Sequence, residues 1–160
     1  MLAAVRAGHK TVTRRRLSSG LPMQQHPDRY RFIGACAQGV LFEDCHTQPP
    51  SLLPLVPLPF GPPGTCLSVS EDPLLVLKIV AVHAGQVRDL TDADALAEGI
   101  RPYPQPGPPQ WGGVEPKAAH PGTFRWYASP VAAFRGLLDS IYPTAWARNE
   151  WVWVIVFERQ

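Results

Sequence analysis

The hydrophobic pattern of the chain predicts short strands separated by turn-rich segments. Residues 30–42 contain several β-branched and aromatic side chains and are expected to form one strand or a hairpin, with Gly34 and Gly39 as bends; residues 66–70 are expected to form a further strand. Residues 74–82 and 151–157 read LLVLKIVAV and WVWVIVF, and both runs are apolar at nearly every position. Because a strand with one solvated face alternates apolar and polar residues, these two runs are expected in the middle of a sheet.

Two stretches combine the apolar spacing of a helix with residues that start or stop one. Residues 2–9 suit a short helix, and Gly8 is placed to end it in a left-handed conformation. Ser129 and Pro130 suit the cap and the first position of another helix, which Pro143 ends. The apolar stripe predicted for this helix consists of Val131, Phe134, Leu137, Leu138 and Ile141.

A third helix is predicted between Thr91 and Gly99. Thr91 is expected to cap it, Asp94 stands where a capping box needs an acid, and Gly99 closes it. Glu98 then lies in the last turn, where a carboxylate faces the negative end of the helix dipole. A residue placed against its local preference is sometimes functional, which makes Glu98 a candidate site residue.

Proline and glycine are the unusual part of the composition. Nineteen prolines and thirteen glycines among 160 residues predict long irregular connections. We expect them at about 43–64 and 101–123, as insertions rather than as linkers between domains. A chain of this length can bury one core. Together these patterns predict a single α+β domain over residues 1–160.

Charge and cysteine usage narrow the class of protein further. An apolar fraction of 45% and a charged fraction of 18% fit a globular chain rather than a disordered one. No apolar run of about 18 residues could span a membrane, and no signal-peptide core follows Met1. The three cysteines lack a C-x-x-C spacing, which favours reduced thiols, and we expect a cytoplasmic protein.

The densest positive charge lies in the first sixteen residues, which carry five lysine or arginine residues and no acid. The G-H-K-T run at residues 8–11 superficially resembles a phosphate-binding loop, but the glycines that this motif requires are missing. Adjacent Cys45 and His46, without a second spaced pair, make a poor zinc site, so we expect no metal and no cofactor. No G-x-S-x-G turn supports a hydrolase triad.

Lys10, Thr13 and Glu98 remain as candidate catalytic residues. A hydroxyl is a weak nucleophile that needs a base, and a partly desolvated lysine can serve as one. A carboxylate nearby can orient that lysine or move protons. A regular strand from Lys10 to Thr13 would direct the two side chains to opposite faces, whereas an irregular link would let them converge. From the spacing alone, a solvated basic patch is the favoured explanation.

Four blocks of the sequence, spread in order over nearly the whole chain, match one family pattern. Residues 7–15 read AGHKTVTRR, which is similar to A-G-x-K-T-x-T-x-R. Residues 60–71 resemble Y-G-x-x-G-D-x-L-W-V-R-E, and residues 90–100 resemble I-T-x-x-D-A-x-A-E-G-I. Residues 134–154 resemble F-x-x-L-W-D-x-I followed by N-P-W-V-W-V. The chain therefore resembles the ASCH domain family, especially the versions found in phages and prophages.

The resemblance implies a fold and an activity. The fold would be PUA-like: a small mixed β-barrel with peripheral helices and a cleft that faces a nucleoside or nucleic acid. Characterised members are amidohydrolases that remove the acetyl group from N4-acetylcytidine, using a lysine, a threonine three residues later and a glutamate. These positions match Lys10, Thr13 and Glu98, as base, nucleophile and partner of the base. Other relatives are thought to bind or cleave RNA.

The substrate-positioning residues implied by the resemblance are Arg14, Arg15 and Glu71, with a nucleoside or RNA as the partner. The chain departs from the family pattern after Gly64, at positions 65, 66, 68 and 70. The family's first strand precedes the lysine segment, so either the barrel lacks a strand or the assigned start is too late. Two alternatives to an amidohydrolase or ribonuclease remain. One is a non-catalytic module that binds RNA or nucleotide, and the other is a decayed prophage protein without activity.

Overall fold

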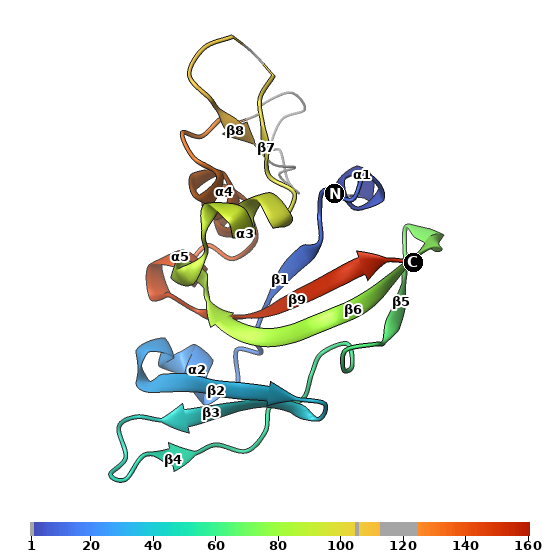
Figure 1. The fold of residues 1–160 in the computed structure, drawn as a ribbon. Helices are drawn as coiled ribbons and strands as arrows, with labels where there is room; N and C mark the ends of the chain where they lie inside the picture. The colour runs from blue at the N-terminus through green and yellow to red at the C-terminus, as the bar shows by residue number, and fades with distance from the viewer. Residues whose placement is uncertain (1, 105, 113–124) are drawn as a thin grey trace. The chain divides into compact units, whose positions relative to one another are not determined.

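The computed structural model describes residues 2–104, 106–112 and 125–160, which form a mixed α+β structure (Figure 1). Every strand pair in this part of the chain is antiparallel. The predicted α+β class is confirmed.

The chain divides into two compact units, and each is assembled from two separate segments. One unit combines Met1–Thr11 with Arg88–Arg148 and is called the helical unit below. The other combines Val12–Val87 with Asn149–Gln160 and is called the sheet unit. The single domain over residues 1–160 stays a prediction.

The sheet unit contains a four-stranded sheet in the order β1-β9-β6-β5. Its strands are β1 (Val12–Arg16), β5 (Cys66–Val69), β6 (Asp72–Gln86) and β9 (Trp151–Arg159). β9 lies between β1 and β6 (Figure 1), as its apolar character on both faces predicts. Its first five residues are all buried. β6 is also internal, but it extends well beyond the predicted 74–82.

A second, three-stranded sheet in this unit has the order β2-β3-β4. β2 (Tyr30–Cys36) and β3 (Gly39–Asp44) form a hairpin, which is one of the two alternatives predicted for residues 30–42, and β4 (Ser51–Leu52) is a short edge strand. The helices α2 (Pro22–Gln25) and η1 (Pro27–Arg29) precede it. β4 lies in the segment 43–64, which the sequence pattern predicted as irregular.

The core of the sheet unit consists of side chains from both of its sheets. Phe42 and Trp151 meet edge to face with ring centroids 4.9 Å apart, a favourable arrangement for two aromatic rings. The buried cluster contains Leu17, Met23, Val40, Phe42, Val56, Ile79, Val82, Ala84, Trp151, Trp153 and Ile155.

The closed barrel expected from the resemblance is not seen in the described part of the chain. Within the sheet unit, backbone ladders join the strands into the four-stranded and the three-stranded sheet, and neither sheet pairs with itself or with the other. A barrel needs a closing ladder, so the structure shows antiparallel sheets rather than a barrel.

The helical unit is built from short helices and a two-stranded hairpin. These elements are α1 (Leu2–Arg6), α3 (Asp92–Ala97), β7 (Arg101–Pro102), β8 (Trp111–Gly112), α4 (Pro130–Ile141) and α5 (Ala145–Arg148), with η2 (Val87–Asp89) at the boundary between the units. Residue 105 and residues 113–123 of the predicted second insertion, about 101–123, lie outside the described residues.

The predicted start of α4 is confirmed, but the prediction that Ile141 belongs to its buried apolar stripe is wrong. The Ser129 hydroxyl accepts from the Ala132 amide, and Pro130 is the first helical residue. Phe134 and Leu138 are buried, whereas Ile141 is 47% exposed. Ile141 is the last residue of the helix, where the turn that would continue the apolar face is absent.

Candidate functional site

Lys10 is positioned by the way α1 ends. Gly8 has a φ of 69°, the left-handed conformation that glycine adopts without the clash of a side chain. The amides of His9 and Lys10 both donate to the Ala4 carbonyl, at 2.8 and 3.0 Å. These bonds turn the chain back over the end of α1 and leave Lys10 in an irregular link before β1.

Glu98 is positioned by the two ends of α3. At the start, the Asp94 amide donates to the Thr91 hydroxyl and the Thr91 amide donates to the Asp94 carboxylate, which is the predicted capping box. At the end, Gly99 has a φ of 102° and its amide donates to the Leu96 carbonyl. Glu98 is therefore the last residue before the chain leaves the helix, as predicted.

The structure brings Lys10 and Glu98 together as a buried ion pair in the helical unit. The Lys10 Nζ is 2.5 Å from Glu98 Oε2 and donates to the Glu98 carbonyl oxygen at 2.9 Å. Each residue is only 7% exposed. Removing one partner of such a pair costs about 3–5 kcal/mol, because the other charge stays buried without compensation.

The pair also resolves the unfavourable position of Glu98. A carboxylate at the C-terminal end of a helix is repelled by the partial negative charge of the free carbonyls. The ammonium of Lys10 lies against both the carboxylate and one of these carbonyls, so it neutralises both. The arrangement places an amine and a carboxylate in hydrogen-bonding contact, shielded from water, which is the requirement for proton exchange between them.

The other predicted site residues belong to the sheet unit. Thr13 pairs with Ile155 and Arg15 with Trp153, so both lie on the face of β1 that carries the core of that unit. Arg14 pairs with Val154 on the opposite face. Arg14 and Arg15 therefore point to different sides of β1, and only Arg15 shares a face with Thr13.

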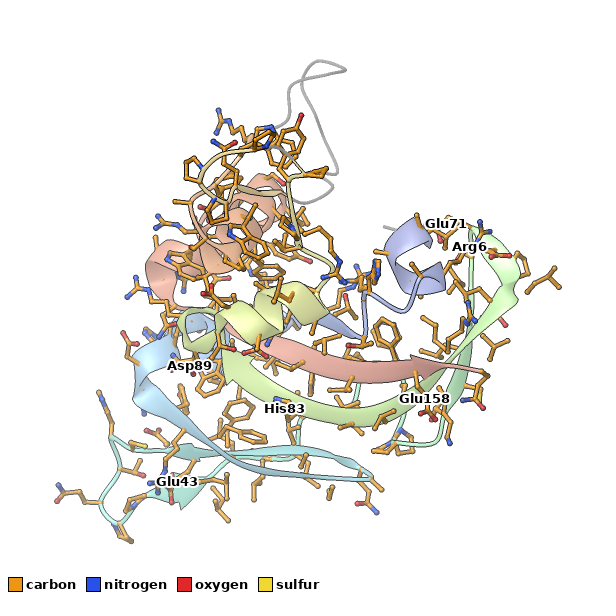
Figure 2. All side chains as sticks on the ribbon, turned by 45° about the horizontal axis from the view of Figure 1, so that its top comes forward. Arg6, Glu43, Glu71, His83, Asp89 and Glu158 are labelled. Atoms are coloured by element: carbon orange, nitrogen blue, oxygen red, sulfur yellow. The ribbon has the colours of Figure 1, made fainter. Side chains whose placement is uncertain are left out.

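Glu71 lies at the turn between β5 and β6 (Figure 2). Glu71 is exposed and belongs to the tight turn that joins Val69 of β5 to Asp72 of β6. The predicted role of Glu71 in positioning substrate stays a prediction.

Sequence reasoning did not find Arg101, which lies beside the Lys10–Glu98 pair. Its guanidinium donates to the carbonyls of Leu96, Ile100 and His9, at 3.2, 2.9 and 2.7 Å. A basic residue just beyond a helix C-terminus is a recognised signal for binding the last carbonyls, and that signal was present two residues after Gly99.

Two further ion pairs, both in the sheet unit, are structural. Arg16 holds the fully buried Glu150, with Nε 2.6 Å from Oε2 and Nη2 donating to Oε1 at 2.8 Å. Arg29 holds Asp44 through bonds of 2.6–3.0 Å. The hydrogen bonds from Arg29 lower the pKa of the Asp44 carboxyl below its ordinary value, although desolvation opposes the shift.

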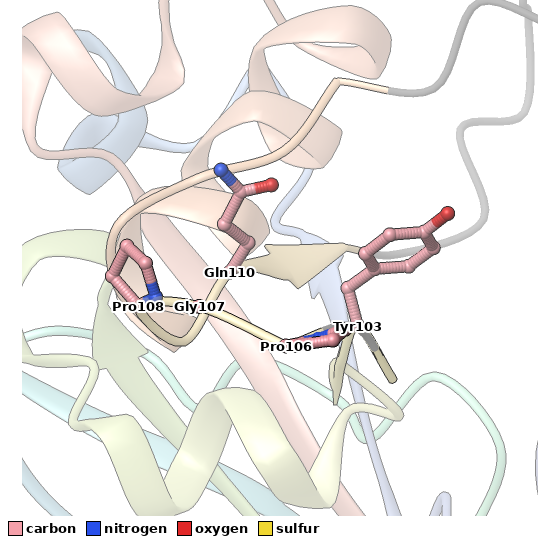
Figure 3. A pocket seen from close by; sticks show the side chains of 5 residues that line it. All are labelled: Tyr103, Pro106, Gly107, Pro108 and Gln110. Carbon is pink, nitrogen blue, oxygen red and sulfur yellow. The ribbon is translucent and has the colours of Figure 1, made fainter.

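One small pocket of about 80 Å³ lies in the loop between β7 and β8 (Figure 3). It is lined by Tyr103, Pro106, Gly107, Pro108 and Gln110. Pockets that enclose small-molecule ligands usually measure about 300–1,000 Å³, so this pocket is too small to enclose a nucleoside.

The described residues contain no group of three His, Cys, Asp or Glu side chains able to hold a metal ion. None of the helices in the same part of the chain has the length and apolar character needed to cross a membrane.

Comparisons with protein-family models, with curated proteins and with solved structures found no match to this chain. The geometry of the helical unit and the sequence blocks therefore carry the functional argument.

Proposed function

We propose that the chain is a nucleoside- or RNA-directed protein of the ASCH type that acts as an amidohydrolase on an N4-acylated cytidine. The supporting observation is the ion pair between Lys10 and Glu98, which are 88 positions apart and are both 7% exposed. Lys10 and Glu98 are the two charged residues among the three catalytic positions that the motif resemblance implies. The proposal includes a PUA-like fold and a cytoplasmic location.

In the proposed reaction, Thr13 is the nucleophile and Lys10 the base. Thr13 follows Lys10 by three residues, so chain geometry keeps their Cα atoms within about 11 Å of each other. The Thr13 hydroxyl would attack the acyl carbonyl carbon while its proton passes to the neutral amine of Lys10. Collapse of the tetrahedral intermediate breaks the bond to N4, and the proton moves from Lys10 to that nitrogen. Water then hydrolyses the threonine ester and releases acetate.

Glu98 has a separate role in this scheme. A lysine accepts a proton only as a neutral amine, so the site needs a group that can take the proton from the ammonium. The Glu98 carboxylate, 2.5 Å from Nζ, is placed to do so and to hold the amine in one orientation.

The test is incubation of the purified chain with N4-acetylcytidine and measurement of released acetate. We expect release by the wild type, loss with Lys10→Met, Glu98→Gln or Thr13→Val, and partial activity with Thr13→Ser, which keeps the hydroxyl. Glu150→Gln is the matched control, because it removes the charge of another buried, paired carboxylate. Absence of acetate from the wild type would refute the proposal. If Glu150→Gln lost as much acetate release as the site variants, the loss would be due to reduced stability of the protein rather than to a missing catalytic group.

A non-catalytic module that binds RNA or nucleotide is the second candidate. The observation that favours it is the bond from Lys10 Nζ to the Glu98 carbonyl, because capping a helix end is a structural role that requires no reaction. This candidate predicts RNA binding that weakens steeply with salt, without acetate release or RNA cleavage. Replacing the exposed Arg15 by glutamine would then reduce the dependence of RNA affinity on salt by about one phosphate contact.

A further inference from the structure

The two segments that form the Lys10–Glu98 pair are joined at several points around it. The Thr11 amide donates to the Ala97 carbonyl at 2.9 Å, which holds the peptide that follows Lys10. Arg101 Nη2 donates to the His9 carbonyl at 2.7 Å, which holds the peptide that precedes Lys10. The backbone on both sides of Lys10 is thus fixed against the end of α3.

Arg101 also donates hydrogen bonds to carbonyls at the end of α3. Its Nη1 donates to the carbonyls of Leu96 and Ile100, on either side of Glu98 in the sequence. A single planar guanidinium therefore connects the residue before the lysine to the residues two positions before and two positions after the glutamate. Only arginine can span these acceptors, because a lysine ammonium is a compact charge without a fork of donors.

We propose that Arg101 is a positioning residue for the Lys10–Glu98 pair. Lys10 has a flexible four-carbon stem, and holding it in one conformation costs side-chain entropy. Fixing the Lys10 backbone on both sides directs the stem along Gly99, where a Cβ would lie in ordinary van der Waals contact with the Lys10 stem, 3.5 Å from its Cβ and 3.8 Å from its Cδ. Arg101 thereby determines where the ammonium meets the carboxylate.

The catalytic part of this inference rests on the proposed amidohydrolase function. Misplacement of a reacting group by about 1 Å can lower a rate by a factor of about 100. Arg101→Lys keeps the positive charge at the end of α3 but cannot make all three carbonyl bonds. We expect kcat for N4-acetylcytidine to fall roughly 10- to 100-fold with little change in KM, because Arg101 has no part in binding the substrate.

Arg88 supplies a matched control in the same unit. Its guanidinium also bonds carbonyls at the end of a short helix, those of Trp146 at 2.9 Å and Ala147 at 2.6 Å. Arg88→Lys therefore loses the same kind of contact away from the ion pair. We expect its kcat to stay within about twofold of the wild type. An equal fall in kcat for both variants would overturn the positioning role.

A second measurement tests the positioning role of Arg101 without an assay of catalytic activity. The chain has three lysines, at positions 10, 78 and 117, so ¹H–¹⁵N spectra of lysine ammonium groups can be assigned with Lys10→Met. A buried, bonded ammonium exchanges its protons slowly, and we expect a sharp Lys10 signal in the wild type and in Arg88→Lys but a broadened or shifted one in Arg101→Lys. An unchanged signal in Arg101→Lys would refute the inference. Absence of acetate from the wild type would refute only the amidohydrolase.

Discussion

Replacing Lys10 by methionine isolates the energetic contribution of the buried ion pair. Methionine keeps an unbranched, flexible stem of similar length, so the apolar contacts are largely preserved and the charge is lost. Glu98, 7% exposed, then retains a buried carboxylate without its ammonium. We expect the free energy of unfolding to fall by about 3–5 kcal/mol, of which the helix dipole accounts for about 0.3–1 kcal/mol.

A double-mutant cycle distinguishes the ion pair from two independent losses. Glu98→Gln alone leaves a buried ammonium, whereas Lys10→Met with Glu98→Gln removes both charges together. Because the residues are in direct contact, we expect the double variant to lose less stability than the two single losses combined, by about 1–3 kcal/mol. The double variant should be folded and yet release no acetate, which separates stability from chemistry.

The assay is urea unfolding followed by the fluorescence of the five tryptophans, extrapolated to zero denaturant. Lys78→Met serves as the control, because Lys78 pairs with Glu158 at 3.3 Å with both side chains about half exposed. That substitution should cost less than about 1 kcal/mol. Additive losses within about 0.5 kcal/mol, or a Lys10→Met cost as small as that of Lys78→Met, would refute the reasoning.

Three further predictions concern stability. Gly99→Ala should cost about 1–2 kcal/mol because of the positive φ, while Gly20→Ala, which meets no atom within 4 Å, should be nearly neutral; urea unfolding of both variants is the measurement. Thr91→Ala should cost about 1 kcal/mol in the same assay by removing the helix cap, and an unchanged midpoint would contradict the role of the cap. The lowered pKa of Asp44 contributes stability that is present above its ordinary value of 3.8 and is lost as the pH falls through its folded value. Unfolding as a function of pH should therefore show a weaker acid dependence for Asp44→Asn, and an identical dependence would argue against the bond from Arg29.

Local signals in the sequence predicted local structure well. The capping box at Thr91, the serine and proline that start α4, and the glycine that ends α1 all act through bonds to neighbours within a few residues. Such bonds depend little on the rest of the chain, so they can be inferred without a structure.

Features that depend on distant partners were predicted less well. β6 continues to Gln86 because His83, Gly85 and Gln86 pair with residues of β9, and this ladder does not follow from the composition of residues 83–86. The pairing of Lys10 with Glu98 was a hypothesis from the motif, since the spacing alone favoured a solvated patch. Arg101 was not predicted, because its contact with the His9 carbonyl joins positions 92 residues apart.

The position of β9 has a consequence for how the protein is made. β9 lies between β1 and β6, yet residue 151 is synthesised long after both of these strands. Until then β1 and the largely apolar β6 lack the strand that pairs with both of them, and an unpaired apolar edge such as that of β6 favours association with other chains. The four-stranded sheet can therefore assemble only after translation has passed residue 159, and a nascent chain arrested before Trp151 would be prone to aggregate rather than to fold.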